Sequence, residues 1–244
     1  MGFKRKLRKI YRSGVKFIMI YFDKVSKVYS PTSIALEDVS FSIAPKEFIS
    51  LVGSSGAGKS TLLKMLLAEE RPTSGKVFFE SHDVHNLTRA ELPKVRRRMG
   101  VVFQDYKLLP HKTAYENVAF ALEAGGAAEE DIERDVPQVL ELVGLMDKAW
   151  HFPNELSGGE KQRVAIARAI VTKPDVVVAD EPTGNLDPAN THEIINLLEK
   201  INALDTIIIL DTHDKEIINS LKRRVVTLDK GKVIRDEERG KYVL

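Results

Sequence analysis

The sequence contains no cysteine and no long hydrophobic run. Without cysteine the chain forms no disulfide, has no thiolate nucleophile and cannot hold a metal through sulfur. Its strongest apolar runs, TIIIL and VVVA, are far shorter than the roughly 20 residues that a membrane-spanning helix needs. We therefore expect a chain that does not itself span a bilayer.

Acidic residues are absent from residues 1–18, which carry seven lysines and arginines. The rest of the chain therefore has a net charge of −5, although the whole chain has a net charge of +2. Because binding of nucleic acid requires a basic face on the folded domain, we expect no nucleic acid partner. Residues 1–18 are predicted to be a basic extension. It either contacts the anionic inner leaflet as an amphipathic helix, or is a disordered tail or an upstream start before a domain that begins at Met19.

From Met19 onward the chain changes its hydrophobic pattern twice. MIYFDKVSKVY and IALEDVSFSIAPKEFISLVG alternate apolar and polar residues, which predicts an antiparallel β layer leading into a buried strand. Residues 106–171 have helical patterns, and strands then alternate with helices, which is typical of a parallel sheet covered on both faces. We predict one α/β domain over residues 19–244, with a mixed sheet core, an antiparallel β layer and a helical subdomain inserted at residues 106–171.

A phosphate-binding loop is predicted from GSSGAGKST, which lies between a predicted strand and a predicted helix. Its glycines let successive backbone N–H groups point at phosphates. A Gly-Ser turn that merely carries a lysine is the alternative. Lys59 is expected to neutralise the β- and γ-phosphates, Ser60 to ligate Mg²⁺ and Thr61 to support the α-phosphate region. The predicted ATP-binding loop comprises Gly53, Ser54, Ser55, Gly56, Ala57, Gly58, Lys59, Ser60 and Thr61.

Two adjacent acids, Asp180 and Glu181, follow the apolar run VVVA. They are expected at the C-terminal edge of the sheet, where open α/β folds bind ligands. Because carboxylates at a buried strand end need compensation, a bound metal cation is indicated. Asp180 is suited to hold Mg²⁺ through a water, and Glu181 to orient and deprotonate an attacking water.

A second anion-binding turn is predicted at LSGGE, where Ser157, Gly158 and Gly159 begin a helix. The unsatisfied N–H groups and partial positive charge of a helix start favour a phosphate. Taken alone, the same residues are an ordinary N-cap in which Ser157 and Glu160 form a capping box.

The motif order decides between these interpretations. GSSGAGKST, FQD, LSGGE, DEPTGNLD and THD follow one another in an order that resembles ATP-binding cassette ATPases, and the resemblance covers nearly the whole chain from Met19. It implies an ATP-binding cassette nucleotide-binding domain with a RecA-like core. It also implies a homodimer that assembles head to tail around two ATP molecules. In such a dimer the turn of one copy binds the ATP of the other, and the residues implied to act in trans are Ser157, Gly158, Gly159 and Asp187.

The same resemblance implies roles for other positions. Tyr29 would stack on adenine, with a core tyrosine as the alternative. Gln104 would touch Mg²⁺ and the attacking water, and His213 would hydrogen-bond the γ-phosphate and that water. Lys59, Gln104, Glu181 and His213 are thus the expected catalytic residues.

Asp211 departs from the family, because relatives usually carry a small or apolar residue there. Its carboxylate is expected either to raise the proton affinity of His213 or to point away from it.

Within the family, RRRMGVVFQDYKLLP and ADEPTGNLD resemble the cell-division ATPases, and the Asp105-Tyr106 pair favours them over lipoprotein-release and macrolide-export ATPases. This implies an integral membrane partner that docks near Gln104 to Tyr115 and regulates peptidoglycan hydrolysis. The protein would lie peripherally on the cytoplasmic face of the cell membrane, at the division site. ATPases that act on nucleic acid or in translation are the alternative from another class. The former separate the two phosphate-binding motifs by a coiled coil, and the latter carry two cassettes in one chain.

Overall fold

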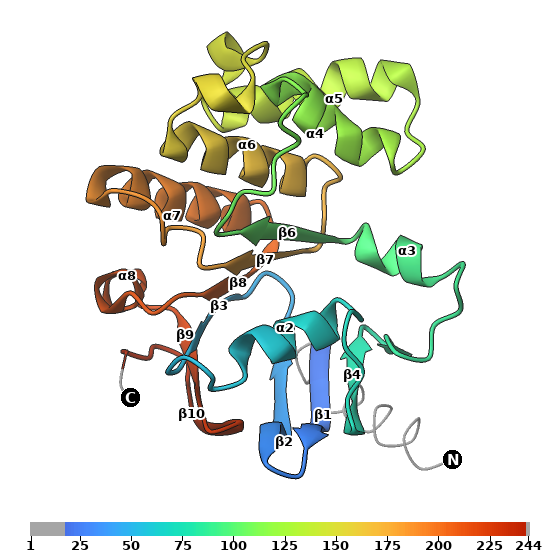
Figure 1. The fold of residues 1–244 in the computed structure, drawn as a ribbon, viewed down its shortest axis with the longest axis vertical. Coiled ribbons are helices and arrows are strands. Elements are labelled where there is room, and N and C mark those ends of the chain that lie inside the picture. Colours follow the sequence, from blue (N-terminus) through green and yellow to red (C-terminus); the bar gives the residue numbers. More distant parts are fainter. Residues whose placement is uncertain (1–17, 243–244) are drawn as a thin grey trace.

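The computed structural model describes residues 18–242, which form three layers (Figure 1). An antiparallel sheet lies at the bottom of the view, a mostly parallel sheet crosses the middle, and a group of helices lies at the top. The predicted basic extension falls outside the described residues, apart from Ile18. Within residues 18–242 no helix has both the length and the apolar composition required to cross a bilayer.

The first sheet is antiparallel and has the strand order β2-β1-β4-β5. Its apolar positions alternate with polar ones, so that one face is buried and the other is solvated. The strands are β1 (Ile20–Ser30), β2 (Ser33–Ile43), β4 (Ser74–Phe79) and β5 (His82–Asp83).

The second sheet has the order β10-β9-β3-β8-β7-β6, and all its strands are parallel except β10. The predicted mixed sheet core with an antiparallel layer is therefore confirmed. The strands are β3 (Phe48–Val52), β6 (Met99–Phe103), β7 (Val176–Asp180), β8 (Ile207–Asp211), β9 (Arg224–Asp229) and β10 (Lys232–Glu237).

The helices cover the second sheet from both sides. Helix α2 lies between the two sheets, whereas α4, α5 and α6 form the layer at the top (Figure 1). The helix α3 and the strand β5 were not predicted, because elements this short show no hydrophobic period. The helices are α2 (Lys59–Leu66), α3 (Leu92–Arg96), α4 (Ala114–Glu123), α5 (Glu129–Leu142), α6 (Gly158–Ile170), α7 (Pro188–Ala203) and α8 (Lys215–Leu221), with 3₁₀ turns at Met146–Lys148 and Pro153–Glu155.

Alternation along β7 and β8 divides the interior into two apolar cores. Val178 and Ile209 pack in the core that contains α2, whereas Val177 and Ile208 pack in the core that contains the helical layer and α7. Because side chains alternate along a strand, the last residues of both strands, Asp180 and Asp211, point to the α2 side. Strand periodicity thus directs two carboxylates toward the start of one helix.

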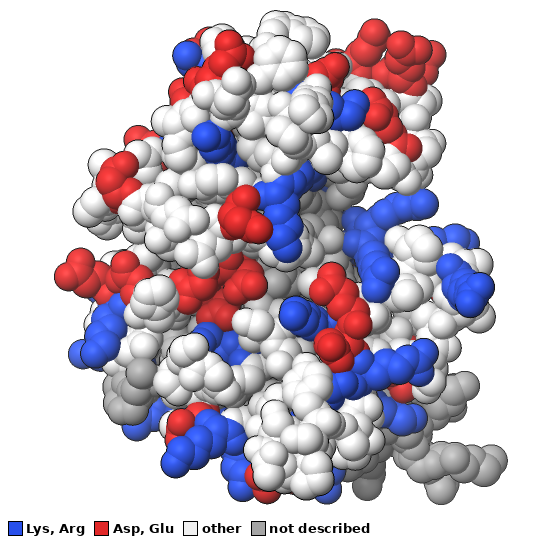
Figure 2. All heavy atoms as spheres, viewed as in Figure 1, with Lys and Arg blue, Asp and Glu red and all other residues white. Residues whose placement is uncertain are grey.

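The charged side chains are mixed on the face seen in Figure 2, where acids gather over the start of α5. Glu129, Glu130 and Asp131 occupy the first turn of that helix. Negative charge there is favourable because it faces the positive end of the helix dipole.

Candidate functional site

A cleft of about 630 Å³ lies at the C-terminal edge of the parallel sheet. It brings together every residue predicted to act on the chain's own nucleotide except Tyr29. The lining residues are Ala35, Gly53, Ser54, Ser55, Gly56, Ala57, Gly58, Lys59, Ser60, Thr61, Gln104, Asp180, Glu181, Asp211, His213 and Tyr242.

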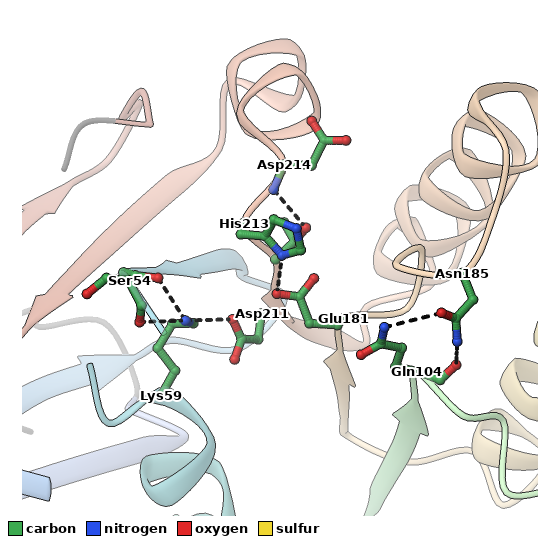
Figure 3. Close-up of polar contacts among 10 residues, drawn as sticks. Ser54, Lys59, Gln104, Glu181, Asn185, Asp211, His213 and Asp214 are labelled. Carbon is green, nitrogen blue, oxygen red and sulfur yellow. Dashed lines mark hydrogen bonds and ion pairs between the residues drawn. The ribbon is translucent and has the colours of Figure 1, made fainter. Parts of the chain in front are cut away.

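The loop between β3 and α2 forms one wall of this cleft. Gly58 has a φ of 104°, and a Cβ there would lie 2.7 Å from Leu36 Cδ2, so only glycine fits. Because α2 begins directly after Gly58, its first N–H groups and the positive end of its dipole lie at the cleft. The Lys59 ammonium donates to the carbonyl oxygens of Gly53 at 2.8 Å and Ser54 at 3.4 Å (Figure 3).

Two carboxylates from β7 and β8 lie opposite this loop. Asp180 and Asp211 are paired in the register of the two parallel strands. Burial, followed by the charge of Glu181, raises the pKa of the Asp180 carboxyl. A cation beside this carboxyl would therefore stabilise its charged form. Because Ser60 lines the same cleft, the site fits Mg²⁺, which is held by one or two carboxylates together with substrate phosphates.

Glu181 leaves the strand in a left-handed conformation, with a φ of 48°. Such a φ is uncommon for a residue with a side chain and is often found at functional sites. The Glu181 N–H donates to the Asp211 carbonyl oxygen at 2.9 Å, which fixes this turn. The Glu181 carboxylate then reaches His213, with 2.7 Å between Oε1 and Nδ1.

His213 lies in the mouth of the cleft, and its side chain is 73% exposed. The hydrogen bond to Glu181 raises the pKa of the imidazole. The next residue, Asp214, caps α8 by accepting from the N–H groups of Glu216 and Ile217. Of the two expectations for Asp211, the second is confirmed: its Oδ1 lies 3.7 Å from Lys59 Nζ, and Glu181 is the carboxylate that acts on His213.

Gln104 follows β6 and is held by the loop of the motif DEPTGNLD, in which the sequence did not single out Gly184 or Asn185. Asn185 Nδ2 donates to the Gln104 carbonyl oxygen at 3.1 Å, and Gln104 Nε2 donates to Asn185 Oδ1 at 3.4 Å. A Cβ at Gly184 would lie 2.7 Å from Gln104 Nε2, so the glycine makes room for the amide. The motif TGNLD contains both residues, but no local pattern indicated their partner.

The segment after Gln104 is joined to α6 by Arg168. Its guanidinium donates to the carbonyl oxygens of Tyr106 at 2.8 Å and Lys107 at 2.7 Å. Both acceptor residues have positive φ, 58° and 47°, so the hydrogen bonds hold an unfavourable backbone. Arg168 was not predicted as a functional residue, because a single arginine in a helix is a common feature of sequences.

The second predicted anion site lies outside the cleft. Ser157 caps α6 in a capping box with Glu160, as its alternative interpretation required. Asp187 caps α7 through Asn190, and these hydrogen bonds lower the pKa of the Asp187 carboxyl. A Cβ at Gly159 would overlap Asn190, so the starts of α6 and α7 are in contact. All the residues predicted to act in trans are therefore grouped away from the chain's own loop.

The structure also places two aromatic residues, Tyr29 and Tyr242. Tyr29 is 54% exposed, with the Lys27 ammonium 4.9 Å from its ring centroid, so the interpretation as a core tyrosine is wrong. Tyr242 lines the cleft, and burial raises the pKa of its hydroxyl. The sequence did not indicate Tyr242, because it lies in a short terminal segment without a motif.

The chain was compared with known families and proteins. The sequence profile described as ABC transporter matches residues 36–184. The cell division ATP-binding protein FtsE of Bacillus subtilis is 51% identical over 224 residues, which are 92% of this chain and 98% of that protein. FtsE of Mycobacterium tuberculosis is 51% identical over 226 residues, again 92% of this chain and 98% of that protein.

Solved structures agree with the sequence relatives. A dimeric post-hydrolysis state of the ATP-binding cassette MJ0796 bound to ADP and Pi has a TM-score of 0.81 and 35% identity, over 92% of this chain and all of that chain. CbiO1 of Clostridium perfringens, part of the ABC transporter complex cbiONQ, has a TM-score of 0.84 and 30% identity, over 92% of this chain and 90% of that one. The chain therefore belongs to the ABC transporter family, as one of its ATP-binding and ATP-hydrolysing members.

Proposed function

We propose that this protein is an FtsE-like subunit that hydrolyses MgATP as a head-to-tail homodimer. It drives an FtsX-like membrane partner that regulates peptidoglycan hydrolysis during cell division. The near full-length similarity to cell division proteins named FtsE supports this proposal. Residues 19–244 act as the ATPase domain, and residues 106–171 as its helical subdomain.

In the proposed mechanism, the loop of residues 53–61 cradles the phosphates and Lys59 neutralises the β- and γ-oxygens. Ser60, Gln104 and Asp180 would hold Mg²⁺, which would neutralise charge on the phosphates when bound. Tyr29 stacks on adenine from outside the cleft.

Glu181 accepts the proton of the attacking water. Because His213 Nδ1 is bonded to Glu181, the protonated imidazole keeps its Nε2–H free to donate to the γ-phosphate. Water attack needs positioning and charge stabilisation more than covalent chemistry, and these groups supply both.

One observation carries the dimeric mechanism. The turn at Ser157 and the cap residue Asp187 lie together at the starts of α6 and α7, and none of their residues lines the cleft that holds Lys59. A helix start with free N–H groups is an anion site that its own chain does not use. A second copy, rotated by a two-fold axis, would bring its ATP to this turn, and both sites would be completed together.

The test uses Glu181→Gln to prevent turnover. With saturating MgATP, E181Q should form a stable dimer in size-exclusion chromatography, and E181Q combined with Ser157→Glu should stay monomeric while its monomer binds ATP normally. Ala128→Glu in the E181Q background is the matched control, because it adds the same charge at the N-cap of α5. A monomeric E181Q, or loss of ATP affinity in the S157E monomer, would contradict the scheme.

The membrane partner is proposed to dock near Gln104 to Tyr115. Beside the end of this segment, Tyr115 stacks on Trp150 with ring centroids 4.9 Å apart, and Trp150 is 69% exposed. Phe120, Met146 and Phe152 are also exposed on the helical subdomain. The exposed Trp150 stacked on Tyr115 supports a contact surface here, because aromatic side chains are enriched at protein interfaces. Docking there would place the protein peripherally on the cytoplasmic face of the membrane.

Co-purification from membranes tests this surface. Trp150→Ala should reduce recovery of the membrane partner without changing the ATPase activity of the isolated protein. Leu204→Ala, which removes a similarly exposed apolar side chain at the end of α7, should not. Recovery of a lipoprotein-release or macrolide-export permease in place of FtsX would assign the protein to that transporter class.

A further inference from the structure

Asp211 is a buried carboxylate that the mechanism above does not use. Its side chain is 2% exposed at the end of β8, and Oδ1 has no hydrogen-bond partner among the described residues. In the sheet it pairs with Leu51 of β3 on one side and with Asp180 of β7 on the other. The carboxylate therefore lies between the strand that leads to the phosphate-binding loop and the strand that carries the acidic pair.

The nearest cation to this carboxylate is the Lys59 ammonium. The distance from Asp211 Oδ1 to Lys59 Nζ is 3.7 Å, and the lysine side chain is 11% exposed. The same ammonium donates to the carbonyl oxygens of Gly53 and Ser54, within its own loop. Figure 3 shows the ammonium between the loop and Asp211. The Lys59 ammonium thus contacts two carbonyl oxygens of its own loop and the Asp211 carboxylate.

The other acids of the cleft have different means of compensation. Glu181 is bonded to His213 at 2.7 Å, and Asp180 lies with Ser60 where Mg²⁺ would bind. Among residues 18–242, the one cation within 4 Å of the Asp211 carboxylate is Lys59. Since Lys59 is also the cation that the β- and γ-phosphates require, the carboxylate and the phosphates compete for one ammonium.

We propose that Asp211 is a positioning residue that holds Lys59 against its own loop and so weakens the binding of ATP and ADP. This inference rests on the role proposed above for Lys59 in holding phosphates. Bound phosphates must draw the ammonium away from Asp211 and must also tolerate a carboxylate in the wall of the cleft. When the phosphates leave, Asp211 takes the ammonium back, which favours release of nucleotide.

Removing the charge should therefore strengthen binding. A unit charge a few ångströms from the phosphates in a partly buried site interacts strongly, and after screening we expect about tenfold tighter binding, equivalent to about 1.4 kcal/mol. Asp211→Asn keeps the shape and an oxygen acceptor, and Asp211→Ala removes both. Both variants should bind nucleotide more tightly, because both lack the charge of Asp211.

Calorimetric titration with ATP and with ADP in EDTA at pH 8 tests the inference. D211N and D211A should each bind both nucleotides about tenfold more tightly than the parent. Asp205→Asn is the control for net charge, since Asp205 forms an exposed ion pair with Lys46, and its affinity should be unchanged. If neither the parent nor any variant bound nucleotide, the proposed role of the cleft itself would be refuted. Binding by the parent with equal or weaker binding by the variants would refute only the role of Asp211.

Steady-state kinetics separate this role from a structural one. With MgATP, KM of D211N should fall about tenfold while kcat stays the same or falls, because release of ADP becomes slower. A residue that only supports the fold would lower kcat without lowering KM. A D211N protein that folds less well than the parent would also contradict the inference, because the substitution removes an unsatisfied buried charge.

Discussion

Replacing Asp211 with asparagine should stabilise the nucleotide-free protein, and the gain should grow with pH. Burial raises the pKa of the Asp211 carboxyl to about 7 from the model-compound value of 3.8. The Lys59 ammonium opposes this shift, whereas the charges of Asp180 and Glu181 add to it. The folded protein therefore binds the Asp211 proton more tightly than the unfolded chain does.

The sign follows from linkage between protonation and folding. A carboxyl whose pKa is higher in the folded state lowers the free energy of unfolding as pH rises from its unfolded pKa to its folded pKa. Between 3.8 and about 7 the loss reaches about 4 kcal/mol, at about 1.4 kcal/mol for each pH unit. Part of this loss is already present at pH 5, so D211N should gain about 3 kcal/mol more at pH 8 than at pH 5.

Urea denaturation in EDTA at both pH values measures this difference directly. In a chain of this size the extra gain corresponds to a melting temperature about 5–10 °C higher. D205N, which removes an exposed carboxylate, should show no such pH-dependent gain. Equal stabilisation of D211N at pH 5 and pH 8, or destabilisation at pH 8, would refute the argument from burial.

Substitutions at three further residues have expected outcomes. Gly184→Ala places a Cβ 2.7 Å from Gln104 Nε2 and should misplace the amide. Turnover should then fall at least about tenfold, while ATP affinity measured by calorimetry stays within about twofold. Normal turnover would show that the amide is not needed there. Arg98→Ala removes hydrogen bonds of 2.8 Å to Glu80, directly after β4 of one sheet, and of 2.6 Å to Asp175, directly before β7 of the other. After discounting for exposure, urea denaturation should show a loss of about 1 kcal/mol, and no change would mean that the bridge is not stabilising. Ser157→Ala removes the cap of α6 and should lower the free energy of unfolding by about 1 kcal/mol, whereas Ser157→Asn should restore most of it; equal stability of both variants would argue against the cap.

Most of the architecture could be predicted because its signals are local. Strand alternation located β1, β2 and the buried strands of the parallel sheet, and the helical period located α4 to α7. The loop at residues 53–61 was predictable because its glycines and lysine must be consecutive to cradle a phosphate. Short elements such as α3 lack a full period, so they could not be predicted.

The contacts that adjust the site were not predictable. Asn185 holds Gln104 from 81 positions away, and Arg168 holds the carbonyl of Tyr106 from 62 positions away. No spacing rule relates such pairs, because loops of variable length join the elements that carry them. The exposure of Tyr29 could not be predicted either, because the same alternating strand pattern fits a strand whose end is buried or exposed.

The sequence by itself determined the loop, the acidic pair, the second helix start and the side of each strand on which a carboxylate must lie. Only the tertiary structure decided which cation Asp211 meets. Side-chain alternation is a property of one strand, whereas the neighbours of β8 follow from the order in which β3, β8 and β7 pair. That order depends on crossover connections that bring distant segments together. For this reason a carboxylate two residues before His213 acts on Lys59, at the start of α2 after the neighbouring strand β3, and Glu181 acts on the histidine.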